Sequence, residues 1–170
     1  ILHGAGREDI DALCYGTGRP FVMEMANPKI RTADLRELEE AINKSAMPEV
    51  EVRLESWSNK KTVEMLKSHK GHKTYRILVS VDDRISLENV QNAVSKLNGA
   101  WIAQRTPNRV SHRRADLVRK RQVIGIQVLG IENGLYRLEV VGDSGLYIKE
   151  LISGDEGRTS PSLSEILAAP

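Results

Sequence analysis

Residues 122–141 read QVIGIQVLGIENGLYRLEVV, two β-rich runs joined by an Asn-Gly pair. β-Branched and other apolar residues fill residues 122–131 and 135–141, which favours strands. Asn133 and Gly134 are the residue types that tolerate the two positive φ angles of a tight hairpin turn. The stretch therefore predicts an antiparallel hairpin.

Segments on both sides of this hairpin predict further strands and helices. Residues 74–81 alternate, so that Tyr75, Ile77 and Val79 share one face of a strand. Two more strands are predicted, over residues 20–25 and 50–57. Capping residues predict helices after Asp34, Ser58, Ser86 and Ser162, and a further helix is predicted over residues 147–152.

The remaining segments are predicted to lack regular strands. Residues 1–18 are expected to form a loop, and residues 105–121 a long loop or partly helical arm. The helix after Asp34 is expected to stop near Asn43, and the helix after Ser86 at Asn98-Gly99. This order of elements indicates an α+β fold with a largely antiparallel sheet flanked by helices and loops.

The composition is that of an ordinary globular chain. The 170 residues suit one domain or a large fragment, with 40% apolar and 28% charged residues. No apolar run approaches the roughly 20 residues of a membrane helix, and residues 1–20 lack a signal-peptide pattern. The single cysteine, Cys14, gives no internal disulfide or zinc cluster and is expected to be a packing residue in a cytoplasmic protein.

Positive charge is concentrated in residues 105–121, which we call the basic arm. The net charge is only +2, and the rest of the chain is net acidic. This density favours phosphate binding over a merely solvated surface. The cations of the arm, which Asp116 interrupts, are Arg105, Arg109, Arg113, Arg114, Arg119, Lys120 and Arg121, together with His112.

Three other segments carry candidate functional residues. Asp9 lies in a Gly-rich stretch beside Arg7 and could face a ligand as an ionised carboxylate, although composition alone favours a solvated turn. Tyr75 offers a flat face for stacking on a base, with a core tyrosine as the plain alternative. Lys149 lies among apolar residues at a helix start, where it either pairs with a distant carboxylate or lies at the surface.

One motif is a false lead. Gly142-Asp143-Ser144-Gly145 matches the nucleophile tetrapeptide of chymotrypsin-like proteases. Such proteases need an upstream His and Asp in a double barrel with disulfides, and this chain is short for that architecture. A serine hydrolase is therefore not the interpretation that we favour.

Taken in order, the candidate segments resemble a pseudouridine synthase. Gly6-Arg7-Glu8-Asp9 resembles the Gly-Arg-Thr-Asp motif of the TruA family. Lys73-Thr74-Tyr75 and Gly145-x-Tyr147-Ile148-Lys149 resemble the Lys-x-Tyr and Gly-x-Tyr-Ile-Arg segments of TruB-like enzymes. A narrower resemblance, to the archaeal and eukaryotic family that modifies uridines of the tRNA T-loop (positions 54/55), covers nearly the whole chain through residues 6–11, 18–21, 105–114 and 154–159.

This resemblance implies a tRNA pseudouridine synthase without cofactor or metal. Asp9 would be the catalytic carboxylate, Lys149 its counter-ion, and Tyr75 the stacking partner of the flipped uracil. Ile148 would close an apolar wall and Arg7 would hold a phosphate. The basic arm, including His112, would bind the tRNA T-arm, and no obligate protein partner is expected.

The resemblance also sets an expected domain organisation. Residues 1–170 would be the pseudouridine synthase catalytic domain. An N-terminal RNA-binding domain of THUMP type, common in the family, is expected to be missing, and a last core strand with an apolar active-site residue is expected beyond Pro170.

Two other functional classes stay open. A non-catalytic RNA-binding module would keep the basic arm but would not need Asp9, Tyr75 and Lys149 together. A metal-dependent hydrolase could use Asp9 and Asp11, because residues two apart can converge in a loop.

Overall fold

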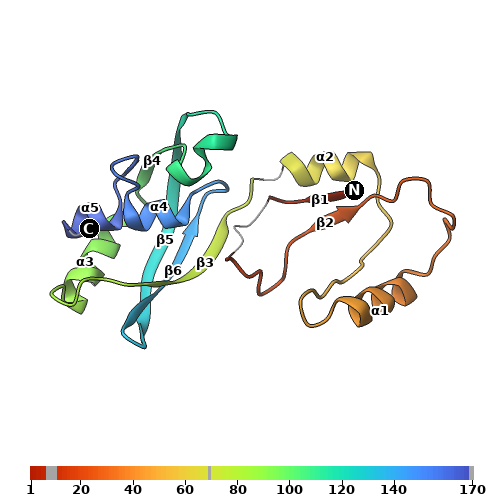
Figure 1. The fold of residues 1–170 in the computed structure, drawn as a ribbon, viewed down its shortest axis with the longest axis horizontal. Coiled ribbons are helices and arrows are strands. Elements are labelled where there is room, and N and C mark those ends of the chain that lie inside the picture. The colour runs from red at the N-terminus through yellow and green to blue at the C-terminus, as the bar shows by residue number, and fades with distance from the viewer. Residues whose placement is uncertain (7–10, 69, 169–170) are drawn as a thin grey trace. The chain divides into compact units, whose positions relative to one another are not determined.

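The computed structural model describes residues 1–6, 11–68 and 70–168. The chain divides into two compact units, Ile1–His69 and Lys70–Pro170, which we call the N-terminal unit and the sheet unit (Figure 1). A single catalytic domain over residues 1–170 stays a prediction.

A two-stranded ribbon lies at the start of the N-terminal unit. β1 (Leu2–Gly4) pairs antiparallel with β2 (Phe21–Met23), with His3 opposite Val22. The predicted strand over residues 20–25 is confirmed. The predicted loop over residues 1–18 is wrong at β1, because only the partner strand, far along the sequence, makes that segment a strand.

Two helices complete this unit. α1 (Leu35–Ala46) begins where the Asp34 side chain accepts hydrogen bonds from the backbone N–H groups of Arg36 and Glu37, at 2.8 and 3.0 Å. It continues past the predicted end at Asn43, and stops because a residue before proline, here Met47, disfavours the helical conformation. α2 (Lys60–Ser68) is capped by Asn59, one residue after the predicted Ser58.

The predicted strand over residues 50–57 is wrong, because side chains of α1 bind the backbone groups that a partner strand would need. The Asn43 side chain donates to the carbonyl of Val52 and accepts from its N–H, at 2.8 and 2.7 Å. Glu39 accepts from the N–H of Leu54. Alternating apolar residues therefore lie along a helix instead of joining a sheet.

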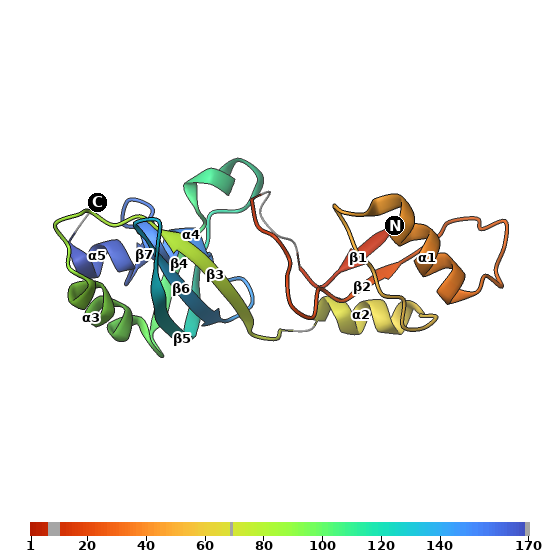
Figure 2. The same cartoon turned by 90° about the horizontal axis from the view of Figure 1, so that it is seen from below.

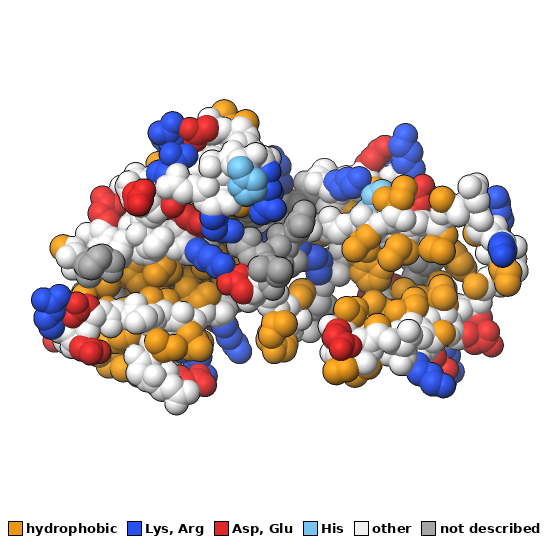
Figure 3. All heavy atoms as spheres, viewed as in Figure 1, with side chains coloured by type: hydrophobic (Ala, Val, Ile, Leu, Met, Phe, Trp, Pro, Cys, Tyr) orange, Lys and Arg blue, Asp and Glu red, His pale blue; other side chains and the backbone are white. Residues whose placement is uncertain are grey.

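The N-terminal unit buries few side chains. Neither α1 nor α2 has a fully buried residue, and apolar side chains are visible on the surface of this unit (Figure 3). Cys14 is exposed, so its predicted packing role is wrong. Within the residues that the structure describes, in either unit, no helix combines the length and the apolar character needed to cross a membrane.

The sheet unit is built on a five-stranded antiparallel sheet. Its strands are β3 (Lys73–Val79), β4 (Trp101–Arg105), β5 (Val118–Glu132), β6 (Leu135–Gly142) and β7 (Thr159–Ser160). They lie in the order β3-β6-β5-β4-β7, with all pairs antiparallel (Figure 2). Asn133 and Gly134, at φ 50° and 79°, form the predicted hairpin turn. The α+β prediction is confirmed.

Three helices and the sheet enclose the core. α3 (Leu87–Leu97) starts at the Ser86 cap and ends at Asn98, with Gly99 at φ 74°, as predicted. α4 (Ile148–Ser153) and α5 (Leu163–Leu167) are also confirmed, the second with a reciprocal capping box at Ser162. The fully buried apolar side chains of this core come from one face of the sheet and from these helices: Val90, Leu97, Ile102, Val123, Leu138, Val140, Leu151 and Leu163.

Candidate functional site

Tyr75 lies on the core side of the sheet. The register places it opposite Val140, which is fully buried. Paired residues of adjacent strands share a face, so the half-buried Tyr75 ring lies on the same face as Ile77 and Val79. The predicted alternation of this strand is confirmed. This position fits both a tyrosine that belongs to the core and a tyrosine whose exposed part stacks on a base.

The first turn of α4 follows the same end of the sheet. Lys73, the first residue of β3, pairs with Gly142, the last of β6, and the chain then enters α4 after five residues. Ile148 packs against the buried core that Ile77 also contacts. Lys149 is exposed in this first turn. Tyr75 therefore lies near the end of the sheet from which the chain leaves for Lys149.

The turn before α4 depends on a glycine and an arginine. Gly145 has φ 86°, and a Cβ on it would lie 3.4 Å from Nε of Arg121. The Arg121 guanidinium therefore packs beside the Gly145 backbone, and its Nη1 donates to the carbonyl of Lys120 at 2.8 Å. Arg121, predicted as part of the RNA-binding arm, contributes to the turn that precedes Lys149.

A buried glutamine fixes the residue at which α4 begins. Gln104 is 1% exposed, and its Nε2 donates to the carbonyl of Tyr147 at 2.9 Å. Its Oε1 accepts from the N–H of Tyr147, also at 2.9 Å. Both hydrogen-bonding groups of the side chain are thus paired, as burial requires. Gln104 was not among the residues selected from the sequence, although a polar residue two positions after the apolar Ile102, and so on the same face of a strand, was a usable signal of burial.

An ion pair joins the basic arm to α4. Arg109 Nε donates to Oε1 of Glu150 at 2.6 Å, and Nη2 to Oε2 at 3.3 Å. The Glu150 side chain is only 5% exposed. The Arg109 guanidinium carbon also lies 5.9 Å from the centre of the Tyr147 ring, within cation–π range. A buried carboxylate is tolerated only with such a partner, so this contact holds the two segments together.

The basic arm is more ordered than predicted. Its first residue, Arg105, ends β4, residues Asn108–Arg113 form the 3₁₀ helix η1, and Val118–Arg121 open β5. The prediction that residues 105–121 form a loop or partly helical arm is therefore wrong at both ends. Residues 101–105 pair with residues 118–122 through their backbones, which does not require apolar side chains. The high density of charge therefore hid the strand pattern in the sequence.

Thr106 anchors the base of the arm. It is fully buried, and its hydroxyl donates to the carbonyl of Ala115 at 2.7 Å while it accepts from the N–H of Leu117 at 3.1 Å. Arg119 Nη1 also donates to this hydroxyl, at 3.0 Å. The carbonyl of Thr106 accepts two hydrogen bonds from Arg158, at 3.1 and 2.7 Å.

Acidic side chains neutralise part of the arm. Arg105 binds Asp116 with Nη2 to Oδ2 at 2.5 Å, and Arg158 binds the other oxygen at 2.9 Å. The hydrogen bond from Arg105, with the added charge of Arg158, holds the pKa of the Asp116 carboxyl below its ordinary value. Asp155 accepts from the N–H of Asn108, at the start of η1, at 3.0 Å. Residues 154–159, recognised in the sequence only as a motif, thus support the arm.

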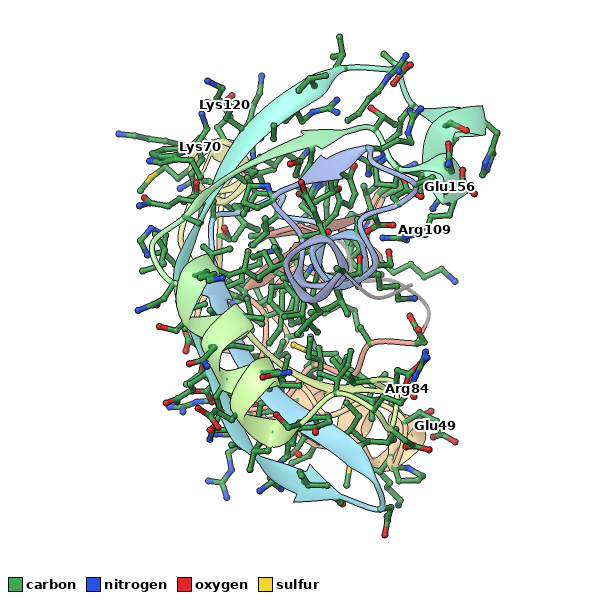
Figure 4. The ribbon with its side chains drawn as sticks, turned by 90° about the vertical axis from the view of Figure 1, so that its left-hand side faces the viewer. Glu49, Lys70, Arg84, Arg109, Lys120 and Glu156 are labelled. Carbon is green, nitrogen blue, oxygen red and sulfur yellow. The ribbon has the colours of Figure 1, made fainter. Side chains whose placement is uncertain are left out.

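The cations of the arm fall into two groups. Protein partners engage Arg105, Arg109, Arg119 and Arg121. Figure 3 shows basic side chains gathered over the part of the sheet unit that contains η1, and Figure 4 shows Lys120 and Arg109 on different sides of it. Arg105 and Arg109 are exposed as well as bound to protein groups, and the second group consists of the exposed residues His112, Arg113, Arg114 and Lys120.

Two of the predicted site residues, Arg7 and Asp9, lie outside the residues that the structure describes. The expected convergence of Asp9 with Tyr75 and Lys149 therefore stays a prediction.

Comparison with known proteins identifies the family. The family described as "Pus10, C-terminal" matches residues 1–170. The chain belongs to the Pus10 C-terminal family. The family resemblance inferred from residues 6–11, 18–21, 105–114 and 154–159 is confirmed, since the Pus10 match includes all four segments.

Curated relatives in the Pus10 family are named as tRNA pseudouridine synthases. The tRNA pseudouridine synthase Pus10 of Korarchaeum cryptofilum is 48% identical over 169 residues, which are 98% of this chain and 45% of the relative. The proteins of the same name from Methanothrix thermoacetophila and Archaeoglobus fulgidus are each 47% identical, over 98% and 96% of this chain and 37% and 45% of the relatives. The chain thus spans less than half the length of these Pus10 relatives.

Proposed function

We propose that this chain is the catalytic part of a tRNA pseudouridine synthase that acts on T-loop uridines, at position 54, 55 or both. The observation that carries the proposal is 48% identity, over 98% of the chain, to a relative named as a tRNA pseudouridine synthase. The quoted T-loop family segments support the choice of substrate. The single cysteine fits the cytoplasmic location that we also propose.

The chemistry needs a carboxylate and little else. The C1′–N1 bond of uridine breaks and a C1′–C5 bond forms, so the reaction is an isomerisation without oxidation, and a cofactor is not required. Asp9 acts either as the nucleophile at C1′ or as the base that removes a proton at C2′. Lys149, exposed in the first turn of α4, keeps this carboxylate ionised by its positive charge.

Tyr75 and Ile148 receive the base. The target uridine must leave its stack to reach a carboxylate. The half-buried Tyr75 ring provides a face on which uracil stacks, and its hydroxyl helps to remove the C5 proton. Ile148, partly buried against the core, forms the apolar wall. The sheet supports this assignment because it brings β3 and the approach to α4 to one end.

The two groups of cations have different roles in this proposal. His112, Arg113, Arg114 and Lys120 are exposed and contact phosphates of the T-arm, as does Arg7. Arg105, Arg119 and Arg121 bind protein groups and give the arm its shape. The role of each cation thus follows from the partner that it binds, which a count of charges does not reveal.

We expect Arg113→Ala with Arg114→Ala to weaken tRNA binding and to flatten its salt dependence. Each lost phosphate contact should lower the slope of log K against log salt by about 0.7 to 0.9. The fold should survive, because both side chains are exposed. The measurement is tRNA affinity at several salt concentrations with full-length protein.

Arg137→Ala is the matched control for this double variant. It removes a cation on β6, 48% exposed and outside the arm, and should leave the salt slope unchanged. Arg119→Ala is unsuitable, because loss of its hydrogen bond to Thr106 destabilises the arm. Parallel salt lines with equal intercepts for wild type and the double variant would show that Arg113 and Arg114 do not contact tRNA.

The decisive test is incubation of the full-length protein with unmodified tRNA, followed by mapping of pseudouridine. We expect modification at position 54, 55 or both, without added metal or cofactor. Tight binding without modification would instead support the RNA-binding module. Magnesium-dependent cleavage of the tRNA would support the hydrolase.

A further inference from the structure

η1 contacts both α4 and the loop that follows it. Arg109 binds the buried Glu150 with two hydrogen bonds. One residue earlier, the N–H of Asn108 donates to Asp155, just after α4 ends. The first turn of η1 is therefore connected both to α4 itself and to the loop that follows α4.

η1 is itself a fixed element. Val110 is 3% exposed and Pro107 is among the fully buried residues, so apolar contacts hold this short helix against the sheet unit. Arg113 and Arg114, the proposed phosphate contacts, follow within a few residues. A tRNA held by these two side chains would therefore have a defined position relative to Arg109.

The contacts of Arg109 lie on both sides of the proposed catalytic residues in the sequence. Its guanidinium lies over the Tyr147 ring and binds Glu150, so Ile148 and Lys149 lie between its two contacts. Gln104 fixes the backbone of Tyr147 from the sheet. The link to Glu150 leaves α4 little freedom, because displacement would separate a buried charge from its partner.

We propose that Arg109 and Glu150 form a positioning pair, which sets the first turn of α4 in place for the reaction on tRNA bound to the arm. This inference rests on the proposed function. Arg109 acts through Glu150 and Tyr147, and is not a phosphate contact. The pair determines where Lys149 and Ile148 lie, and so affects the rate of the reaction more than the affinity for tRNA.

The test compares Arg109→Gln, Glu150→Gln and the double variant in full-length protein. Each single variant should lower the single-turnover rate at saturating tRNA by about 10- to 100-fold, because small displacements of a catalytic group cost this much. The dissociation constant and the salt slope should stay at their wild-type values. The double variant should be no slower than the worse single variant, because both remove one link.

Two further variants separate positioning from general stability. Arg109→Lys keeps a positive charge beside the Glu150 carboxylate and should recover part of the rate. The control pair, Arg76→Gln and Glu139→Gln, breaks an ion pair of similar chemistry, with Nε to Oε2 at 3.0 Å, between β3 and β6. It should leave the rate unchanged. Equal rates for Arg109→Lys and Arg109→Gln, with equally lowered melting temperatures, would reduce Arg109 to a structural role and overturn the proposal.

The same variants distinguish a positioning role of Arg109 from direct contact of Arg109 with a phosphate. If Arg109 contacts phosphate, Arg109→Gln will weaken binding and flatten the salt slope at an unchanged saturating rate, while Glu150→Gln will have little effect. That result would overturn the proposal.

Backbone hydrogen exchange gives a readout that does not need activity. In both single variants, exchange should rise in α4 and not in α3. If the wild-type protein forms no pseudouridine while both variants show this rise, the proposed function is refuted and the link is kept. Unchanged α4 exchange in both variants would refute the link itself.

Discussion

Asp9→Asn should abolish pseudouridine formation and leave tRNA affinity nearly unchanged. The amide keeps the shape of the carboxylate but can neither attack C1′ nor remove a proton, so we expect a loss of about a thousandfold or more. Binding should survive because phosphate contacts supply most of the affinity. The measurements are pseudouridine yield in single turnover and tRNA binding, both with full-length protein.

Asp11→Asn is the matched comparison for this prediction. It removes a carboxylate two residues away and should cost much less. Near wild-type activity in Asp9→Asn, with a large loss in Asp11→Asn, would move the catalytic role to Asp11.

Replacement of Tyr75 should separate stacking from proton transfer. Tyr75→Leu removes the ring and the hydroxyl, and should be severely impaired, since stacking of a base on an aromatic ring is worth about 1–3 kcal/mol. Tyr75→Phe keeps the ring. If Tyr75 only stacks, Phe should be mild, and if its hydroxyl takes part in removal of the C5 proton, Phe should also be slow.

Tyr136 supplies the control for both substitutions. It is half-buried against the same core and pairs with Val79, at the other end of β3. Tyr136→Phe and Tyr136→Leu therefore report the effect of an altered core without an altered site. Full activity in Tyr75→Leu would return Tyr75 to the role of a core residue.

Local signals predicted most of the sheet unit. The Asn133-Gly134 turn, the Ser86 cap and the capping box at Ser162 each act within a few residues, so the sequence alone reveals them. The alternation around Tyr75 also holds, because one face of β3 is buried. The turn and the two caps depend on neighbours in the sequence, not on the rest of the fold.

The incorrect predictions depend on distant partners. Residues 50–57 alternate like a strand, but Asn43 and Glu39 of α1 occupy their backbone groups. Conversely, residues 2–4 look like a loop and become a strand only because β2 lies beside them. An alternating pattern shows that a segment can pair, and cannot show which partner is present.

The candidate site shows the same division. The segments that contain Tyr75, Lys149 and the basic arm could be selected from the sequence, because residue types and order resemble a family. The roles of Gln104 and Glu150 could not be predicted, since they arise from contacts with residues 43 and 41 positions away in the sequence. Charge density also could not separate Arg109, bound to Glu150, from exposed Arg113.

The order of strands has a consequence for how the site assembles. β5 and β6 close across the two-residue turn, whereas β3 joins β6 across a long span, with Arg76 and Glu139 63 residues apart. Closing a long loop costs more conformational entropy than closing a tight hairpin, so the hairpin has the kinetic advantage. β3 pairs with β6 alone and lies at the edge of the sheet among the described strands. The strand that carries Tyr75 is therefore expected to dock late in folding and to open early, so that stacking capacity is lost before the sheet itself unfolds.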